Sequence, residues 1–149
     1  MNFILGIDPG TTETAYCLID KNYKILMADK INNEEFINLC FTSPNIQIAC
    51  ESLQSYGMPV GREVFETAYI IGRIIQKAND NNIPYTLYPR PEYAKSICGV
   101  KKVTDAVLKQ ALEMRFGGYK KGETLAMLKG NSDKRSAFAV AVYHLDKEK

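Results

Sequence analysis

Two carboxylates stand at the ends of two apolar segments of this sequence. Asp8 follows residues 3–7, and Glu51 follows residues 46–50. If these segments are neighbouring parallel strands, both acids emerge at one edge of a sheet, where open α/β sheets place their ligands. Carboxylates brought so close repel each other, and a divalent cation with oxygen ligands relieves the repulsion. The pair indicates a Mg²⁺ site, although either acid alone would be an ordinary strand-end residue.

A third acid, Asp133, stands just before the expected C-terminal helix, whose apolar residues 137–141 would pack on the sheet. Two interpretations of Asp133 remain open at this point. It is either the N-terminal cap of that helix, which is the commoner use of such an aspartate, or a further ligand of the same site.

The elements that must position these acids follow from apolar periodicity and turn residues. Asn32 provides an amide cap for a first helix, and a crossover through that helix would lay the fourth strand parallel to the first. The pattern predicts an α/β fold with a five-stranded mixed sheet, three antiparallel strands and then parallel ones, flanked by helices. Strands are expected at 3–8, 15–19, 24–28, 46–50 and 85–88, helices from 32 onward and at 61–78, 106–116 and 136–145, and a long surface loop at 117–132.

Size and composition are those of one soluble globular domain, residues 1–149, with 46% hydrophobic and 24% charged residues. The sequence shows no basic leader and no apolar run of about 18 residues, so we expect a cytoplasmic protein without a membrane span. The four cysteines form no CxxC pair, so neither a zinc site nor a disulfide framework is expected.

Basic residues concentrate in the last third of the chain. Residues 95–135 contain ten Lys or Arg against four acids, a balance of +6, which leaves −4 for the remainder of a chain whose net charge is +2. Such a segment indicates either a polyanionic partner or a solvated lysine-rich face.

The motif Ile-Leu-Gly-Ile-Asp-Pro-Gly at 4–10, the strand end at Glu51 and the acid opening the last helix resemble RuvC, the Holliday-junction resolvase family with a ribonuclease H-like fold. The resemblance covers nearly the whole chain. The phage and prophage members of that family are the most similar, through residues 56–61, 98–99, 105, 130–133 and 137–141.

The resemblance implies a metal-dependent endonuclease that resolves Holliday junctions or other branched DNA by paired phosphodiester hydrolysis. Asp8, Glu51 and Asp133 match the metal-binding carboxylates of the family, which implies two Mg²⁺ ions about 4 Å apart, with Mn²⁺ able to substitute. The sequence departs from the pattern at Ser136, where cellular members usually have a second acid or a histidine. A serine is a weaker ligand, which could hold a metal-bound water.

Residues 94–99 resemble the family segment that approaches DNA. On this basis we expect Lys95, Lys101, Lys102 and Lys109 to contact phosphates, and Lys109 could also stabilise charge at the scissile phosphate. Tyr56 lies in a loop that meets the junction centre in the family, so its ring either stacks on an unpaired base or packs on the core.

The helix at 61–78 has more apolar residues than one sheet-facing stripe needs, which suggests self-association. The family resemblance implies a two-fold homodimer through this helix. His144, expected to be exposed late in the last helix, is left out of the site. The apolar residues of this helix, some of which would face the sheet, are Val64, Phe65, Ala68, Ile71, Ile74 and Ile75.

The sequence is also compatible with functions other than cutting branched DNA. Residues 6–12 also resemble the first phosphate-binding loop of ATP-binding proteins of the actin and sugar-kinase type, but 149 residues cannot supply the two large lobes of that class, so no nucleotide cofactor is expected. An RNA-processing nuclease of the same fold and a branched-DNA-binding protein with weakened catalysis remain as alternatives.

Overall fold

The computed structural model of the chain describes residues 3–39, 45–55 and 57–149. Its centre is a sheet of five strands in the order β3-β2-β1-β4-β5. The first three strands pair antiparallel, and β4 and β5 continue the sheet in parallel with β1. The predicted five-stranded mixed sheet is confirmed. The strands are β1 (Phe3–Asp8), β2 (Glu13–Asp20), β3 (Ile25–Asn32), β4 (Ile46–Ser52) and β5 (Tyr85–Pro89).

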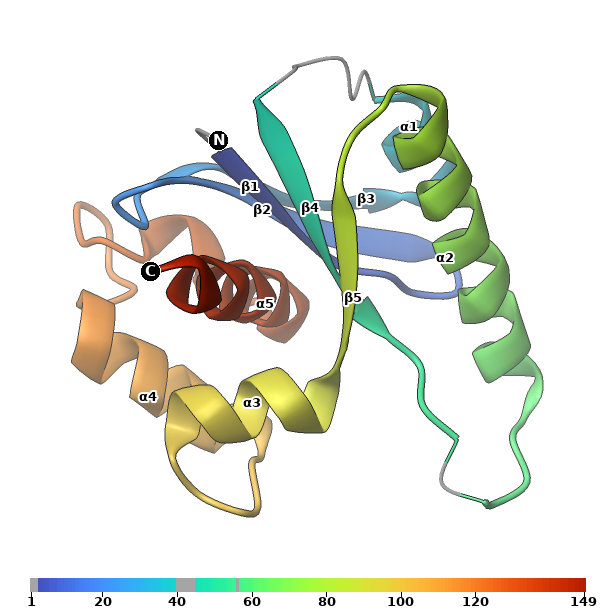
Figure 1. Ribbon diagram of the computed structural model, residues 1–149. Helices are drawn as coiled ribbons and strands as arrows, with labels where there is room; N and C mark the ends of the chain where they lie inside the picture. The colour runs from blue at the N-terminus through green and yellow to red at the C-terminus, as the bar shows by residue number, and fades with distance from the viewer. Residues whose placement is uncertain (1–2, 40–44, 56) are drawn as a thin grey trace.

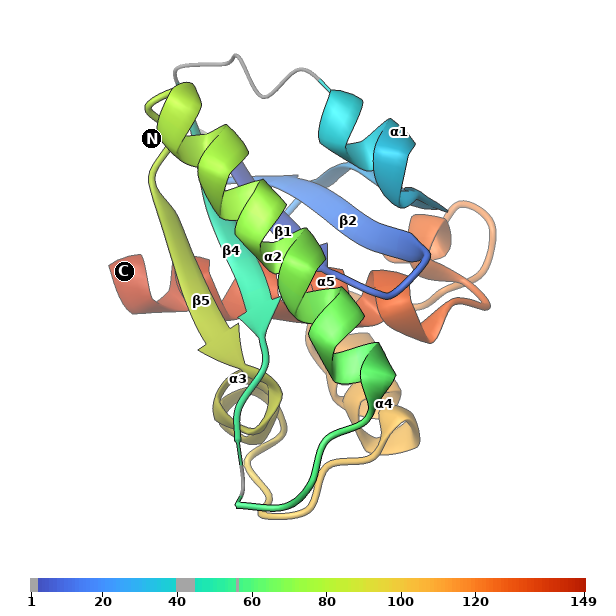
Figure 2. The ribbon, with the colours of Figure 1, turned by 90° about the vertical axis from the view of Figure 1, so that its right-hand side faces the viewer.

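Helices cover both faces of this sheet (Figure 1). On one face lie α1 and α2, and on the other lie α3, α4 and α5. Figure 2 shows α2 crossing in front of the sheet with α5 behind it. The helices are α1 (Asn33–Asn38), α2 (Arg62–Asp80), α3 (Arg90–Cys98), α4 (Asp105–Phe116) and α5 (Ser132–Glu148), with a short 3₁₀ turn η1 (Ala126–Leu128).

Two hydrophobic cores follow from the alternation of side chains along the strands. In β1, Ile4 faces the core under α5, whereas Leu5 and Ile7 face the core under α2. The sheet is therefore buried on both faces at its centre, which leaves the end of β1 as the place for polar chemistry on this strand.

The packing of β1 against α5 is unusually close at Gly6. A Cβ atom at this position would lie 2.0 Å from the carbonyl oxygen of Ala137 and 2.8 Å from the Cβ of Ala141. Small residues on both elements allow this approach. The approach brings the end of β1 beside the first turns of α5, where the two candidate ligands Asp8 and Asp133 line one cavity.

Helix α1 begins as the sequence predicts. The side chain of Asn32 accepts a hydrogen bond of 2.8 Å from the backbone N–H of Glu34, and acids occupy the first turn. Helix α5 begins earlier than predicted, at Ser132 rather than 136, because Asn131 caps it by accepting bonds of 3.0 Å from the N–H groups of Asp133 and Lys134.

Helix α3 was not predicted. Only Tyr93 and Ala94 are buried in it, so its nine residues show no clear apolar period. Its ends nevertheless carry local signals: Pro91 stands in the first turn, and Gly99 at the C-terminal cap has a φ of 69°, which favours glycine.

Two further expectations were wrong. The segment 117–132 is not simply a surface loop, because Tyr119, Leu125 and Leu128 pack into the core. His144 is buried rather than exposed: its Nδ1 is 2.8 Å from the Tyr88 hydroxyl and its Nε2 is 2.8 Å from Oε1 of Gln47. These bonds satisfy both ring nitrogens, so His144 has a structural role in the core.

Among the described residues, Cys17, Cys50 and Cys98 are free thiols. Over the same residues, no helix is both long enough and apolar enough to cross a bilayer.

Candidate functional site

The first two predicted acids meet at the ends of neighbouring parallel strands. Ile7 of β1 pairs with Cys50 of β4, which puts Asp8 and Glu51 at the next positions of the two strands. The pKa of Asp8 is raised well above its usual range. Burial is the largest cause, followed by a hydrogen bond with Glu51, the charge of Glu51 and the charge of Asp133. The charged form of Asp8 is therefore disfavoured at this edge of the sheet, first by burial and then by its acidic neighbours.

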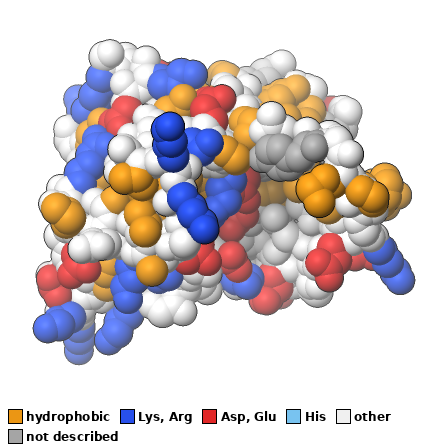
Figure 3. All heavy atoms as spheres, turned by 90° about the horizontal axis from the view of Figure 1, so that it is seen from below, with side chains coloured by type: hydrophobic (Ala, Val, Ile, Leu, Met, Phe, Trp, Pro, Cys, Tyr) orange, Lys and Arg blue, Asp and Glu red, His pale blue; other side chains and the backbone are white. Residues whose placement is uncertain are grey.

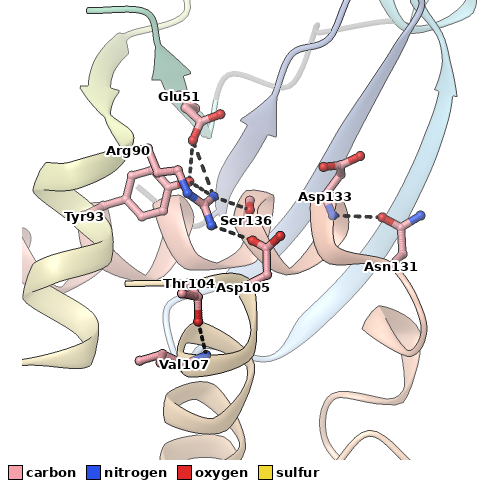
Figure 4. Close-up of polar contacts among 9 residues, drawn as sticks. All are labelled: Glu51, Arg90, Tyr93, Thr104, Asp105, Val107, Asn131, Asp133 and Ser136. Carbon is pink, nitrogen blue, oxygen red and sulfur yellow. Dashed lines mark hydrogen bonds and ion pairs between the residues drawn. The ribbon is translucent and has the colours of Figure 1, made fainter. Parts of the chain in front are cut away.

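The Glu51 carboxylate is held in place by helix α3. The hydroxyl of Tyr93 donates a hydrogen bond of 2.6 Å to Oε1 of Glu51 (Figure 4). The ring of Tyr93 is fully buried, so its hydroxyl is rigidly positioned. Nη1 of Arg90 lies 3.8 Å from the same carboxylate oxygen. Glu51 is thus oriented by a neutral donor and approached by a cation.

Arg90 connects three elements around Glu51 (Figure 4). Its Nη1 donates to Oγ of Ser136 at 2.8 Å, and its Nη2 donates to Oδ1 of Asp105 at 2.7 Å. Ser136 is only 2% exposed. Ser136, the residue expected to hold a metal-bound water, thus accepts a hydrogen bond from the guanidinium of Arg90 instead.

Arg90 and Tyr93 are site residues that the sequence did not predict, and Asp105 was noted only as part of the family resemblance. A signal was present for Arg90. It follows β5, a parallel neighbour of β4, and therefore stands at the same sheet edge as Asp8 and Glu51.

Asp133 is the second residue of α5 and is not its cap, so the capping interpretation is wrong. Its Oδ2 accepts a hydrogen bond of 2.7 Å from Nζ of Lys30 on β3. Asp133 and Lys30 line a cavity of about 240 Å³ together with Asp8 and residues 9–13. Asp133 therefore belongs to the same hollow as Asp8, but a lysine holds its carboxylate.

The described residues contain no group of three His, Cys, Asp or Glu side chains placed to hold one metal ion together. The pair Asp8 and Glu51 still fits a divalent cation. Both are carboxylates, the ligands that Mg²⁺ prefers, and burial together with the neighbouring Glu51 raises the pKa of Asp8. Lys30 holds Oδ2 of Asp133, so Asp133 would join them through its other carboxylate oxygen or after it leaves Lys30.

The predicted DNA-binding lysines fall into two groups. Lys95, Lys101 and Lys102 line a hollow of about 250 Å³ together with Arg90. Lys109 lies elsewhere: its Nζ is 5.7 Å from the centroid of the Tyr119 ring, and it lines a different hollow with that ring. The structure therefore connects the first three lysines, through Arg90, to the acids, and does not do so for Lys109.

An apolar surface is exposed on α2 and on the loop between β4 and α2. Phe65 and Tyr69 on α2 are 53% and 68% exposed, and three residues of the preceding loop are exposed as well, namely Leu53, Met58 and Val60. Figure 3 shows most of the blue lysine and arginine side chains toward the left and centre of this end of the molecule, with orange hydrophobic side chains at the right and also among them. Tyr56, the predicted stacking residue, lies outside the described residues.

Fold and site together define a class: a five-stranded mixed sheet with carboxylates at the ends of its first and fourth strands is a ribonuclease H-like fold. No family model matches the sequence, and no curated protein matches it. Solved structures with a similar fold include two of RuvC. The structure described as Thermus thermophilus RuvC in complex with a Holliday junction substrate superposes with a TM-score of 0.73 at 13% identity, over 97% of this chain and 93% of that one. A second Thermus thermophilus RuvC structure gives 0.68 at 12% identity, over 95% and 92% of the two chains.

Proposed function

We propose that this chain is a metal-dependent endonuclease that cuts branched DNA, with four-way junctions as its principal substrate. The observation that carries the proposal is the meeting of Asp8 and Glu51 at the ends of adjacent parallel strands. The fold adds support, because the RuvC structure that it resembles was solved with a Holliday junction.

In this proposal Asp8 and Glu51 hold Mg²⁺, with Mn²⁺ able to replace it, and Asp133 contributes through its other carboxylate oxygen or after it leaves Lys30. When bound, the ion polarises a phosphoryl oxygen and activates a water for attack on phosphorus. The chain itself orients the ligands: Tyr93 keeps one oxygen of Glu51 in place through a bond of 2.6 Å.

Lys95, Lys101 and Lys102 bind backbone phosphates in the hollow next to Arg90. Cutting both strands of a junction symmetrically requires two copies of the site. The exposed apolar surface on α2 supports a homodimer that would supply them.

The test is a parallel cleavage assay on a four-way DNA junction, a linear duplex and a structured RNA, with Mg²⁺ or with a chelator. We expect cutting of the junction in Mg²⁺, and a loss of about 100-fold or more in Asp8→Asn and Glu51→Gln, because each removes a ligand of the ion. Asp80→Asn, an exposed acid at the end of α2, is the matched control and should cut like the wild type.

The same assay separates the alternatives. Preferential cutting of the RNA would show an RNA-processing nuclease of this fold. Tight binding of the junction without cutting in any metal would show a DNA-binding protein that has lost catalysis, a function favoured by the guanidinium at Ser136.

A further inference from the structure

Arg90 places a permanent positive charge beside the candidate metal ligands. Its guanidinium stands 3.8 Å from Glu51 and donates to Ser136 at 2.8 Å. Ser136 is the position at which the resemblance leads one to expect a second acid or a histidine. Ser136 therefore provides no acidic ligand, and the guanidinium of Arg90 stands beside it instead.

We propose that the guanidinium of Arg90 is the second cation of this site, so that the acids bind one divalent ion rather than two. The inference rests on the proposed function, since it concerns how the same acids are neutralised. It makes Arg90 a positioning residue for Glu51 and assigns the metal stoichiometry.

The charges around the site support a single ion. Glu51 has Arg90 as a partner, and Asp133 has Lys30 at 2.7 Å. Among the described residues, Asp8 forms no ion pair with a lysine or arginine. Asp8 thus has no cation in direct contact, although the charges of Arg90 and Lys30 reach it, and one divalent ion placed between Asp8 and Glu51 would relieve their repulsion.

The guanidinium is held firmly where it is. Arg90 is the first residue of α3, and its two terminal nitrogens bond to Ser136 on α5 and to Asp105 on α4. A guanidinium keeps its charge at every pH at which the protein folds, and its planar fork suits two fixed acceptors. A second divalent ion beside Ser136 would face this charge without gaining a carboxylate ligand.

The test counts bound Mn²⁺ by calorimetric titration and by electron paramagnetic resonance. The protein is measured alone and with a saturating four-way junction, after subtraction of the ions bound by DNA alone. We expect one ion per chain in the wild type and two in Arg90→Gln combined with Ser136→Asp, which removes the guanidinium and restores an acid. Arg90→Lys keeps the charge and should bind one ion.

Arg115→Gln is the matched control, because Arg115 also pairs with an aspartate and its side chain is 40% exposed against 34% for Arg90. It should bind one ion. Two ions in the wild type, or a single ion in the double variant with an unchanged melting curve, would overturn the inference. The wild-type count decides by itself, so a variant that does not fold leaves the test intact.

The two proposals fail in different ways. Two ions in the wild type together with junction cutting would reject the single-ion site and keep the nuclease. No bound ion in any variant and no cutting would reject both.

Discussion

At the scale of single residues, Asp8 is a carboxyl whose charged form the fold disfavours. Its carboxyl is buried beside Glu51, and burial together with that neighbour raises its pKa. Folding therefore favours the protonated form. The resulting stability is fully present below the unfolded pKa of about 4 and is lost as the pH rises toward the folded pKa. At neutral pH the ion-free protein is less stable than its packing allows.

Asp8→Asn should therefore raise the melting temperature of the metal-free protein at pH 7, because the amide is buried without the proton uptake that the carboxyl needs there. For a domain of this size each kcal/mol gained corresponds to about 2–4 °C. Mg²⁺ should raise the melting temperature of the wild type and leave that of Asp8→Asn unchanged. Scanning calorimetry with and without Mg²⁺ measures both effects.

Asp80→Asn serves as the control for this measurement and should respond to Mg²⁺ as the wild type does. A lower melting temperature for metal-free Asp8→Asn would contradict a charged form of Asp8 that the fold disfavours. An Mg²⁺ response equal to that of the wild type would contradict the role of Asp8 as a ligand.

At the scale of elements, the contact between β1 and α5 determines how close the end of β1 comes to the first turns of α5. That contact depends on the absence of a side chain at Gly6. Backbone atoms of Ala137 lie where a Cβ would be, and backbone cannot move aside as a flexible side chain can.

Gly6→Ala should lower the free energy of unfolding by about 1–3 kcal/mol, because β1 must separate from α5 to admit the methyl group. Urea denaturation measures the change. Gly72→Ala is the matched control: nothing lies within 4 Å of a Cβ at that position, and alanine is favoured in a helix by about 1 kcal/mol. Equal stability of the two variants would refute the close contact.

A second element-scale prediction concerns the hollow between α3 and the segment that follows it. The triple replacement of Lys95, Lys101 and Lys102 by alanine should weaken binding of the junction. It should also make the plot of log binding constant against log salt concentration less steep, by about 0.9 for each phosphate that the variant no longer neutralises. Fluorescence anisotropy at several salt concentrations measures the slope.

The control replaces Lys21 and Lys24, which are exposed at the turn between β2 and β3, by alanine. It should keep the wild-type slope. Equal slopes in the triple variant and the wild type would show that the hollow does not bind phosphates.

At the scale of the whole molecule, the apolar surface on α2 remains uncovered in a single chain. The sheet-facing side of the helix is buried through Ile70, Ile74 and Ala78. Phe65 and Tyr69, by contrast, are exposed to solvent. Of the apolar residues that the sequence shows on this helix, Ile71 and Ile74 are buried and Phe65 is exposed, and Tyr69 adds to the exposed side.

We expect the wild type to be a dimer at micromolar concentration by light scattering, and Phe65→Glu to be a monomer, because a buried unpaired charge opposes association. Met114→Glu on α4 is the control, since Met114 is 81% exposed and lies on the other side of the sheet from α2. It should remain dimeric. A monomeric wild type would refute association through this face.

The sequence by itself determined the strands and the ends at which Asp8 and Glu51 stand. Apolar runs, turn residues and helix caps are local signals, and the crossover rule makes the two strands parallel. The same signals failed at α3 and at the start of α5, where the helix ends are marked by Pro91, Gly99 and Asn131 rather than by an apolar period.

Only the tertiary structure decided which charges face those acids. Arg90 and Ser136 are 46 residues apart in the sequence, and Lys30 and Asp133 are 103 apart. No periodicity encodes such pairs, since they form only when separate elements pack together. The sequence was enough to predict the acids. The cations that pair with two of them, Arg90 and Lys30, depend on how α3, β3 and α5 pack together, and so does the proposed number of metal ions.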